Sequence, residues 1–520
     1  MAPPRVSSAA ERRQLTVMFC DLVGSTALST RLDPEDLRDV IAAYHKCVAD
    51  VVARFHGFVA KYMGDGVLVY FGYPEAHEAD AANAVRAALA TIEAIGALKV
   101  GEARHQVRIG IATGLVVVGE LVGAGEAQER NVVGETPNLA ARLQSVAAPN
   151  SVLIAASTRR LTGDLFDYEP VDPGALKGFD GPVAAWRVLR EQSMQSRFES
   201  LREANQVPLV GREEELDLLM RRWQQAKSGE GRVVLLSGEP GIGKSRLLAA
   251  LLDRIEADCP AILRYFCLPH HQGSVLQPIV AQLSHAAGFE RDDAPEIRRG
   301  KLEALLAKTN DDAAATTALL SELLGLGDTA DSAADPQRRR ARVLSALIDQ
   351  LTSLAQRGPV LMVFEDVHWS DPTSLELFTL TVERLQSLPI LLLITFRPDF
   401  QPPWAGQPHV TSMTLNRLGR RERTAMVEHV SGGKVLPQAL LEQIVERTDG
   451  VPLFVEELTK AVLESEELDQ PMQQLAIPTT LQASLMSRVD RLGSAREVLQ
   501  IGAAIGREFS YELLAAVAGL

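Results

Sequence analysis

The chain has 520 residues, which is too long for one ordinary hydrophobic core and indicates two or more domains. Its apolar content of 46% and charged content of 23% are typical of a folded protein and exclude a largely disordered chain. The formal net charge of −14 argues against a general nucleic-acid or anionic-membrane binder, because such proteins need a basic face.

The cysteines and the apolar runs indicate where the protein works. Cys20, Cys47, Cys259 and Cys267 form no CxxC pair and no zinc-ligand spacing, so they are typical of buried thiols in a reducing cytosol. The N-terminal stretch lacks the apolar run of a signal peptide. The longest apolar runs, such as ILLLITF from Ile390, have the length of a strand and cannot span a bilayer. We therefore expect a cytoplasmic protein without a membrane segment.

Residues 14–190 alternate strand and helix patterns. The patterns predict strands at 14–22, 58–62, 67–71, 105–114 and 151–157, and helices at 33–55, 77–97 and 137–146. The run MGDG between the second and third strands is a hairpin signal. Thr136 before Pro137 predicts a helix start with Thr136 as the capping residue. This order predicts an antiparallel sheet covered by helices on one face.

The rest of the chain begins with a polar, charged stretch at 191–207, which we interpret as a linker. Strand and helix patterns resume at 208 and continue to about Arg397, and beyond Thr414 the pattern is helical throughout. The last residues, REFSYELLAAVAGL, break off inside a helical pattern without a polar tail, which is what a truncated chain would show.

The predicted topology brings two aspartates together. If strand 14–22 pairs with strand 67–71, Asp21 near the end of the first lies beside Asp65 in the hairpin tip. Two converging carboxylates repel unless a cation lies between them, and oxygen-rich sites suit Mg²⁺, which also takes phosphate ligands. Gly24, Ser25 and Thr26 follow directly and offer backbone N–H groups for a phosphate. Taken singly, each aspartate is more typical of a turn or cap residue than of a metal ligand.

A third stretch, NVVGETPNLAARL, places Asn138 and Arg142 four residues apart on one helix face. An amide and a guanidinium suit ribose and phosphoryl oxygens, and the alternative is a solvent-exposed polar stripe.

Together, FCDLVGST, KYMGDGVLVYFG, IGIATG, VVGETPNLAARL and LKGF resemble the class III nucleotidyl cyclase catalytic domain in order and spacing, over residues 13–190. The resemblance implies an α+β ferredoxin-like fold that converts a nucleoside triphosphate into a 3′,5′-cyclic monophosphate and pyrophosphate. It implies that Asp21 and Asp65 bind two Mg²⁺ or Mn²⁺ ions per site. Asn138 would orient the ribose and Arg142 would stabilise charge on the α-phosphoryl group. Lys177 would contact phosphate, although an ordinary surface lysine is the alternative.

The same resemblance bears on the base and on assembly. Lys61 matches the lysine that helps adenylyl cyclases recognise adenine, where guanylyl cyclases typically have glutamate. Its partner position, usually aspartate or threonine, is Asn131, whose amide could serve either base. ATP is the favoured substrate. The resemblance also implies a homodimer. Asp21 and Asp65 would come from one subunit, and its partner would supply Lys61, Asn131, Asn138 and Arg142.

A second nucleotide site follows a strand pattern, in RVVLLSGEPGIGKSRLLAALL. Its run from Gly238 to Ser245 meets the phosphate-loop pattern between strand and helix. Backbone amides at Gly238, Gly241 and Gly243 would hold the phosphates, Lys244 would reach the β/γ oxygens, and Ser245 would bind the Mg²⁺ that accompanies ATP.

The next two strand patterns end on residues that could complete this site. PVLMVFEDVHWSD ends its strand on Glu365 and Asp366, and one of these two would polarise the metal. ILLLITFRPD ends near Thr395 and Arg397, which could sense the γ-phosphate, with a plain strand exit as the alternative.

With PLVGREEEL ahead and DGVPLFVEEL behind, residues 208–475 resemble AAA-related STAND ATPases, whose GxP proline matches Pro452. We expect an α/β P-loop NTPase core at 208–400, a helical subdomain at 401–475 and the start of a winged-helix-like region at 476–520. The order of domains resembles soluble adenylyl cyclases, including multidomain bacterial ones.

The favoured interpretation is an adenylate cyclase whose output is modulated by an ATP-binding module, under an unknown protein or small-molecule regulator. Two alternatives remain open. One is a degenerate cyclase that only senses nucleotide. The other is a transcription regulator driven by the ATPase switch, which would need a DNA-binding domain that these residues do not show.

Overall fold

The computed structural model describes residues 11–25, 33–77, 79–98, 105–120, 130–174, 176, 183–192, 209–258, 261–269, 274–290, 293–308, 313–326, 336–434, 436–464, 498 and 517. Contacts divide them into a first unit, up to Gln192, and a second unit, from Leu209 to Glu464. Thr26, Lys177 and nearly all of the predicted winged-helix-like region at 476–520 lie outside the described residues. In the described parts of the chain, no helix combines the length and apolarity needed to cross a membrane.

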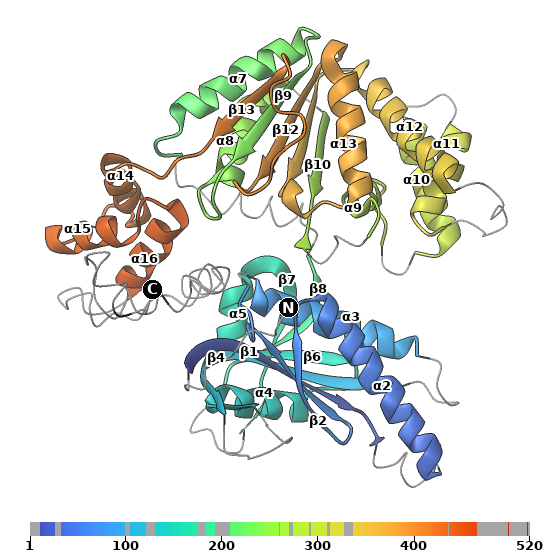
Figure 1. The fold of residues 1–520 in the computed structure, drawn as a ribbon, viewed down its shortest axis with the longest axis vertical. Helices are drawn as coiled ribbons and strands as arrows, with labels where there is room; N and C mark the ends of the chain where they lie inside the picture. The colour runs from blue at the N-terminus through green and yellow to red at the C-terminus, as the bar shows by residue number, and fades with distance from the viewer. Residues whose placement is uncertain are drawn as a thin grey trace. The chain divides into compact units, whose positions relative to one another are not determined.

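The first unit is built on one sheet with the strand order β2-β3-β1-β4-β6-β8-β7, and β5 pairs with β4 (Figure 1). Its strands are β1 (Glu11–Leu22), β2 (Phe58–Met63), β3 (Gly66–Phe71), β4 (Val107–Glu120), β5 (Arg130–Val133), β6 (Ser151–Ala155), β7 (Phe166–Val171) and β8 (Ala185–Glu191). Its helices are α2 (Pro34–Arg54), α3 (Asp80–Gly96), α4 (Glu135–Val146) and α5 (Ala156–Thr162). The order β2-β3-β1-β4 with α2 and α3 between the strands is the predicted ferredoxin-like arrangement.

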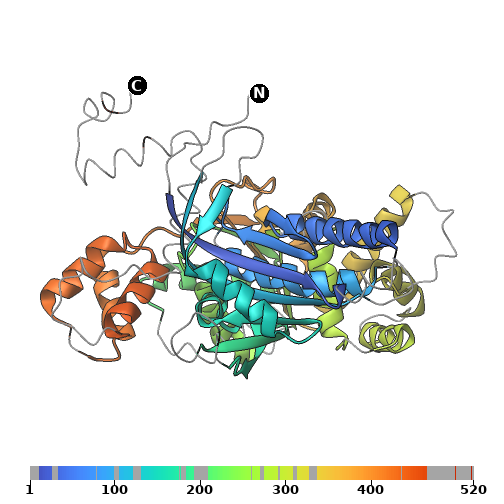
Figure 2. The ribbon, with the colours of Figure 1, turned by 90° about the horizontal axis from the view of Figure 1, so that it is seen from below.

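Alternation along β1 assigns the helices to two faces of this sheet. Met18, Cys20 and Leu22 are buried in one cluster with side chains of α2 and α3. Leu15 and Val17 point the other way, into a second cluster that contains the buried residues of α4. Figure 2 shows α2 in blue and α4 in teal on opposite sides of the sheet. The prediction of helices on one face is confirmed for α2 and α3 and is wrong for α4, because an apolar helix stripe does not tell which side of a sheet it covers.

The start of α4 also differs from the prediction. The helix begins at Glu135 after Gly134, and no side-chain hydrogen bond caps it. Thr136 is buried inside the first turn, and its hydroxyl lies 2.5 Å from where a Cβ on Gly114 would stand. Pro137 still falls in the first turn, where a missing N–H costs nothing. The capping role assigned to Thr136 is wrong because this side chain packs against β4 instead.

The second unit has a parallel sheet with the order β10-β11-β12-β9-β13. Its strands are β9 (Arg232–Ser237), β10 (Ala261–Phe266), β11 (Val360–Glu365), β12 (Ile390–Phe396) and β13 (Val410–Thr414). Its helices are α7 (Glu213–Lys227), α8 (Lys244–Ile255), α9 (Gln277–Ala286), α10 (Pro295–Leu306), α11 (Ala313–Leu323), α12 (Pro336–Ala355), α13 (Pro372–Arg384), α14 (Arg420–Val430), α15 (Gln438–Arg447) and α16 (Pro452–Glu464).

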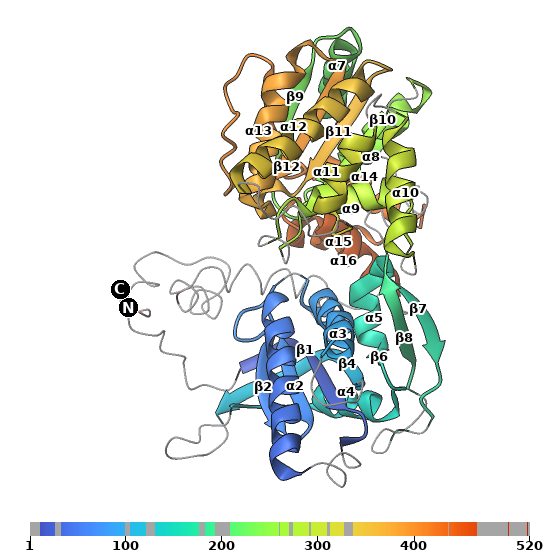
Figure 3. The same cartoon turned by 90° about the vertical axis from the view of Figure 1, so that its right-hand side faces the viewer.

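Helices cover both faces of this parallel sheet, as its continuous apolar strands require. Side chains of α7 and α8 form one core with the sheet, and α9 to α13 contribute to the core on the other face, where Figure 3 shows α10 to α12 in front. Helices α14, α15 and α16 form a separate small core. The predicted α/β core followed by a helical subdomain is confirmed. The predicted boundary at residue 400 is wrong, because β13 (Val410–Thr414) still belongs to the core sheet.

Gly110 in β4 is the point where α4 comes closest to the sheet. A Cβ at this position would lie 2.2 Å from the Gln144 nitrogen and 2.3 Å from the Ala140 carbonyl oxygen. We predict that Gly110→Ala lowers the free energy of local opening of α4 by about 1–3 kcal/mol, because backbone atoms must move to admit the methyl group. Hydrogen exchange of α4 peptides measures this change.

Gly96→Ala is the matched control, because a Cβ there would meet no atom within 4 Å. Exchange in α4 should be the same in this variant as in the unmodified chain. Unchanged protection of α4 in the Gly110→Ala chain would contradict the close packing described above.

Candidate functional site

Asp21 and Asp65 lie side by side at one edge of the first sheet. Strand β1 pairs antiparallel with β3, and Asp21 stands opposite Gly66. The Leu22 N–H donates to the Asp65 carbonyl oxygen at 3.4 Å, so the end of β1 is joined to the hairpin tip. The predicted pairing of these strands is confirmed, and it brings the two carboxylates together.

The electrostatics of this pair are unfavourable without a cation. The pKa of Asp21 is raised to about 6, first by burial, then by the negative charge of Asp65 and by a hydrogen bond between the two carboxyl groups. Smaller opposing effects come from a hydrogen bond with Gln144 of α4 and from the charge of Arg108. Arg108 stands opposite Asp21 on β4, so one cationic side chain already flanks the pair.

The loop after β1 contacts the same pair. Gly24 adopts φ +77°, a left-handed conformation in which a side chain would be strained, and Ser25 follows it. The Ser25 hydroxyl donates a hydrogen bond to Asp65 Oδ2. Of the loop residues predicted to bind phosphate, Gly24 and Ser25 therefore lie beside the aspartates, and Thr26 falls outside the described residues.

These oxygen donors fit a hard divalent cation that completes its shell with other ligands. Across the described residues there is no group of three or more His, Cys, Asp or Glu side chains that could hold a metal alone. Two carboxylates provide too few ligands for six-coordinate Mg²⁺, which usually keeps waters and binds substrate phosphates as well. The donor set therefore fits a divalent cation that takes its remaining ligands from outside this pair of side chains.

Asn138 and Arg142 lie on α4 but point away from the sheet. Ala140 and Leu143 are fully buried against it, whereas Asn138 and Arg142 are exposed. Each of the exposed pair stands two residues from Ala140, which is about 200° around a helix. In one copy of the chain these side chains are therefore directed away from the sheet face that α4 covers.

Lys61 and Asn131 lie on different strands. Lys61 is exposed on β2, opposite Leu68 of β3. The backbone of Asn131 is in β5, opposite Gly119, whereas Asp21 pairs with Arg108, eleven residues earlier on the same strand β4. Eleven residues of extended strand span on the order of 35 Å. One copy of the chain does not bring Asn131 near its own aspartates.

The phosphate-loop motif of the second unit has the predicted strand–loop–helix setting. It joins β9 to α8, and its glycines Gly241 and Gly243 have φ of +74° and +101°, which only glycine adopts readily. The Lys244 ammonium donates to the carbonyl oxygens of Gly238 at 2.8 Å and Glu239 at 3.2 Å. The Lys244 side chain thus lies over the same loop whose backbone N–H groups would bind phosphate.

Glu365 contacts the loop directly. The Ser245 hydroxyl donates to Glu365 Oε2 at 3.0 Å, and Arg264 of β10 forms an ion pair with Glu365 Oε1. Asp366 has φ +57°, and its N–H donates to the Thr395 hydroxyl at 3.0 Å. This hydrogen bond from backbone to side chain joins the ends of β11 and β12.

Arg397 lies beyond the end of β12, and its guanidinium carbon is 5.7 Å from the centre of the Trp369 ring. Such a cation–π contact is compatible with a structural role, so its assignment as a γ-phosphate sensor stays a prediction.

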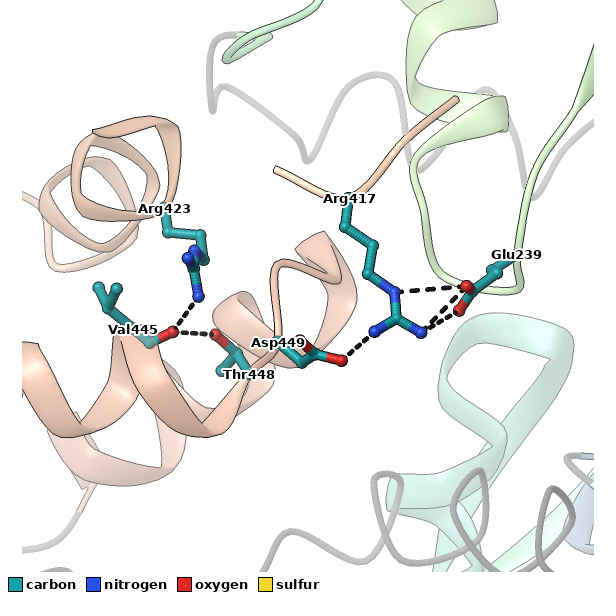
Figure 4. A network of polar contacts seen from close by, with 6 residues as sticks. All are labelled: Glu239, Arg417, Arg423, Val445, Thr448 and Asp449. Atoms are coloured by element: carbon teal, nitrogen blue, oxygen red, sulfur yellow. Dashed lines mark hydrogen bonds and ion pairs between the residues drawn. The ribbon is translucent and has the colours of Figure 1, made fainter. Parts of the chain in front are cut away.

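The segment around Pro452 packs directly on the phosphate loop. The Leu453 N–H donates to the Gly241 carbonyl oxygen at 3.2 Å, and a Cβ on Gly241 would lie 2.9 Å from the Leu453 Cβ. Figure 4 shows a second link, in which Arg417 bridges Glu239 of the loop and Asp449 ahead of α16. The helical subdomain is thus tied to the loop by backbone and by charge.

Sequence reasoning missed Arg264, Arg417 and Glu239. Arg264 and Arg417 carry no local motif, because their partners are 101 and 178 residues away. Glu239 occupies a variable position of the phosphate-loop pattern, so the pattern itself assigns it no role.

We predict that Asp65→Asn stabilises the metal-free first unit at pH 7–8 by about 1 kcal/mol, a value discounted for partial exposure of the pair. Because the folded-state pKa of Asp21 lies above the unfolded value, its ionisation beside Asp65 costs stability as the pH rises through about 6. The gain should therefore shrink below pH 6, where Asp21 takes up a proton. Thermal unfolding in EDTA at pH 5 and 7.5 measures both effects.

Asp50→Asn, at an exposed aspartate of α2, is the control for loss of a carboxylate elsewhere. A destabilised Asp65→Asn protein at pH 7.5 would mean that the two carboxyl groups do not repel each other.

Two family models match the chain. Residues 8–190 match the adenylate and guanylate cyclase catalytic domain, and residues 208–394 match the AAA ATPase domain. An uncharacterised protein of Rhizobium meliloti (strain 1021) is 34% identical over 521 residues, covering 98% of this chain and 50% of that protein. Adenylate cyclase 1 of the same organism is 31% identical over 177 residues, covering 33% of this chain and 26% of that protein.

Among solved structures, the adenylyl cyclase CyaB from P. aeruginosa is 31% identical, covering 35% of this chain and 97% of that chain, with a TM-score of 0.34. The chain spans half the length, or less, of the two curated relatives named above. From the two domain matches we conclude that this chain contains a class III adenylate/guanylate cyclase catalytic domain, followed by an AAA ATPase domain.

Proposed function

We propose that the chain is an adenylate cyclase that converts ATP into 3′,5′-cyclic AMP and pyrophosphate, and that the attached ATPase domain modulates its output in the cytoplasm. The observation that carries the proposal is the convergence of Asp21 and Asp65 at one sheet edge, beside the Ser25 hydroxyl. Two carboxylates that repel each other destabilise the fold unless a cation lies between them, so this pair is well suited to bind divalent cations.

In the reaction, the ribose 3′-oxygen forms a bond to the α-phosphorus, and the α–β bridging P–O bond breaks with its electron pair leaving on pyrophosphate. The 3′-hydroxyl proton is released to solvent. Two Mg²⁺ or Mn²⁺ ions at Asp21 and Asp65 would promote ionisation of the 3′-hydroxyl and neutralise the triphosphate. The backbone N–H groups of the loop at Gly24 and Ser25 would orient the phosphates.

The residues of α4 would serve the other end of the substrate. The Asn138 amide can hydrogen-bond ribose oxygens, and the Arg142 guanidinium can stabilise charge that develops on the α-phosphoryl group. Lys177 would add a phosphate contact, on the strength of the family resemblance alone. Lys61 and Asn131 would bind the adenine edge.

A homodimer would bring these two halves together. In one copy, Asn138 and Arg142 point away from the sheet and Asn131 is far from Asp21 along β4. Exposed apolar side chains on β2 and β4, which a second copy could cover, support the same arrangement: Phe58, Tyr62, Met63, Leu115 and Val117. A two-fold axis would then give two equal sites, each with aspartates from one subunit and Arg142 from the other.

For the ATPase domain we propose ATP·Mg²⁺ binding at the loop from Gly238 to Ser245. The contact of Ser245 with Glu365 supports Glu365 as the carboxylate that faces the metal. The packing of Leu453 on Gly241 supports a helical subdomain that responds to nucleotide, as the resemblance to STAND ATPases implies.

We predict that the purified chain cyclises ATP in preference to GTP, by at least tenfold in kcat/KM. The Lys61 ammonium can only donate hydrogen bonds, and the guanine edge would present donors to it. Leaving such a donor unpaired in the bound complex costs on the order of 1–3 kcal/mol. Product formation from each nucleotide under Mg²⁺ and Mn²⁺ measures the ratio, with Asp65→Ala as the inactive control. Equal turnover of ATP and GTP would refute the assignment of Lys61.

We predict that Asp65→Ala and Arg142→Ala chains are each nearly inactive alone but regain activity when mixed. One of the two sites in the mixed dimer carries neither substitution, so about half of the activity of a wild-type dimer is expected from each heterodimer. The assay needs two different affinity tags, so that heterodimers can be purified and counted. Heterodimers as inactive as either parent would rule out the shared site.

A further inference from the structure

A buried arginine lies at the metal end of the ATPase site, where no sequence motif places one. Arg264 of β10 and Glu365 of β11 form an ion pair, and their side chains are only 3% and 10% exposed. The strands are parallel neighbours, and Glu365 stands opposite Phe266, two residues after Arg264. The Arg264 guanidinium also lies 4.9 Å from the centre of the Phe266 ring. Strand pairing and ring contact both restrict where this guanidinium can lie.

The pair uses the two oxygens of Glu365 differently. Oε1 accepts from Arg264, and Oε2 accepts from the Ser245 hydroxyl at 3.0 Å. Ser245 is the residue that would bind Mg²⁺ together with ATP, so the oxygen that accepts from Ser245 is the one that faces the expected metal. The charge-assisted hydrogen bond from Arg264 fixes the orientation of the Glu365 carboxylate.

We propose that Arg264 is a positioning residue of the ATPase site, which fixes Glu365 so that Oε2 faces the Mg²⁺ of bound ATP. The inference rests on the proposed ATP binding by the second unit. It goes beyond the phosphate-loop pattern, because Arg264 touches neither nucleotide nor metal and acts through the carboxylate. Groups that orient a metal ligand typically change metal affinity 10- to 100-fold when they are removed.

The ion pair between Arg264 and Glu365 also affects whether Mg²⁺ binds before the nucleotide or together with it. Arg264 already balances the charge of Glu365, so this carboxylate attracts a free divalent cation only weakly in the nucleotide-free protein. The additional negative charge that favours Mg²⁺ comes with the triphosphate. Metal and nucleotide should therefore bind together. Once the triphosphate supplies the negative charge, the benefit of Mg²⁺ to ATP affinity should depend on the orientation that Arg264 gives to Glu365.

The test measures the affinity of the full chain for N-methylanthraniloyl-ATP in Mg²⁺ and in EDTA. An Asp65→Ala background disables the proposed cyclase site, and only binding that Lys244→Ala removes is assigned to the phosphate loop. The readout is the ratio of the two dissociation constants, which a general loss of stability would not change selectively. Arg264→Met should reduce the strengthening by Mg²⁺ by about 10- to 100-fold, and Arg264→Lys should have an intermediate effect.

Arg254→Met is the matched control, since Arg254 is an exposed arginine on α8 of the same unit, and its ratio should equal that of the unmodified chain. A double-mutant cycle with Glu365→Gln separates a positioning role from a structural one. If Arg264 acts through Glu365, Arg264→Met causes no further loss of Mg²⁺ dependence in the Glu365→Gln protein. In the double variant both charges of the ion pair are removed, so neither is left buried without its partner. This variant therefore remains informative if Arg264→Met alone folds poorly.

Two results would refute the positioning role of Arg264 without refuting the proposed ATP site. One is an unchanged ratio in folded Arg264→Met protein, and the other is a loss that adds in full to that of Glu365→Gln. A different result, binding that Lys244→Ala leaves intact, would refute the proposed ATP site itself and the inference with it.

Discussion

The antiparallel pairing of β1 with β3 is the contact on which the chemistry of the first unit depends. Its register places Asp21 opposite Gly66 and joins Leu22 to Asp65. Because side chains alternate along a strand, a slip of one residue would turn Asp21 into the core beneath α2 and bring Cys20 to the edge. The apolar residues on both faces of β1 resist such a slip, so the core fixes the position of the charged pair.

The two units differ in how the charge of their acidic groups is balanced. In the first unit, Asp21 and Asp65 stand together, and burial and mutual repulsion raise the pKa of Asp21 to about 6. In the second unit, Arg264 neutralises Glu365 from the neighbouring strand. The first arrangement leaves negative charge that a cation can neutralise. In the second, the arginine already neutralises the carboxylate, and a bound nucleotide would add further negative charge. This difference agrees with the roles we propose, catalysis at the first site and nucleotide-dependent control at the second.

The sequence predicted those features that depend on local patterns and on simple topology. The β1–α2–β2–β3 order placed Asp21 beside Asp65, and the phosphate loop was predicted with its strand and helix. It did not reveal that α4 covers the opposite face, because periodicity shows an apolar stripe but not its partner. It misassigned Thr136, whose burial against Gly114 is a tertiary contact. The pairings of Arg264 and Arg417 join distant residues, for which one sequence contains no signal.

We propose that Asp21 and Asp65 together bind the metal ions of a nucleotide substrate. Anomalous diffraction from crystals grown with Mn²⁺ and 3′-deoxy-ATP, which lacks the attacking hydroxyl, would locate these ions. We expect two manganese peaks between the bound triphosphate and the carboxylates of Asp21 and Asp65, with Arg142 of a second copy at the same nucleotide. Nucleotide bound in the first unit without manganese at this pair of aspartates would contradict it.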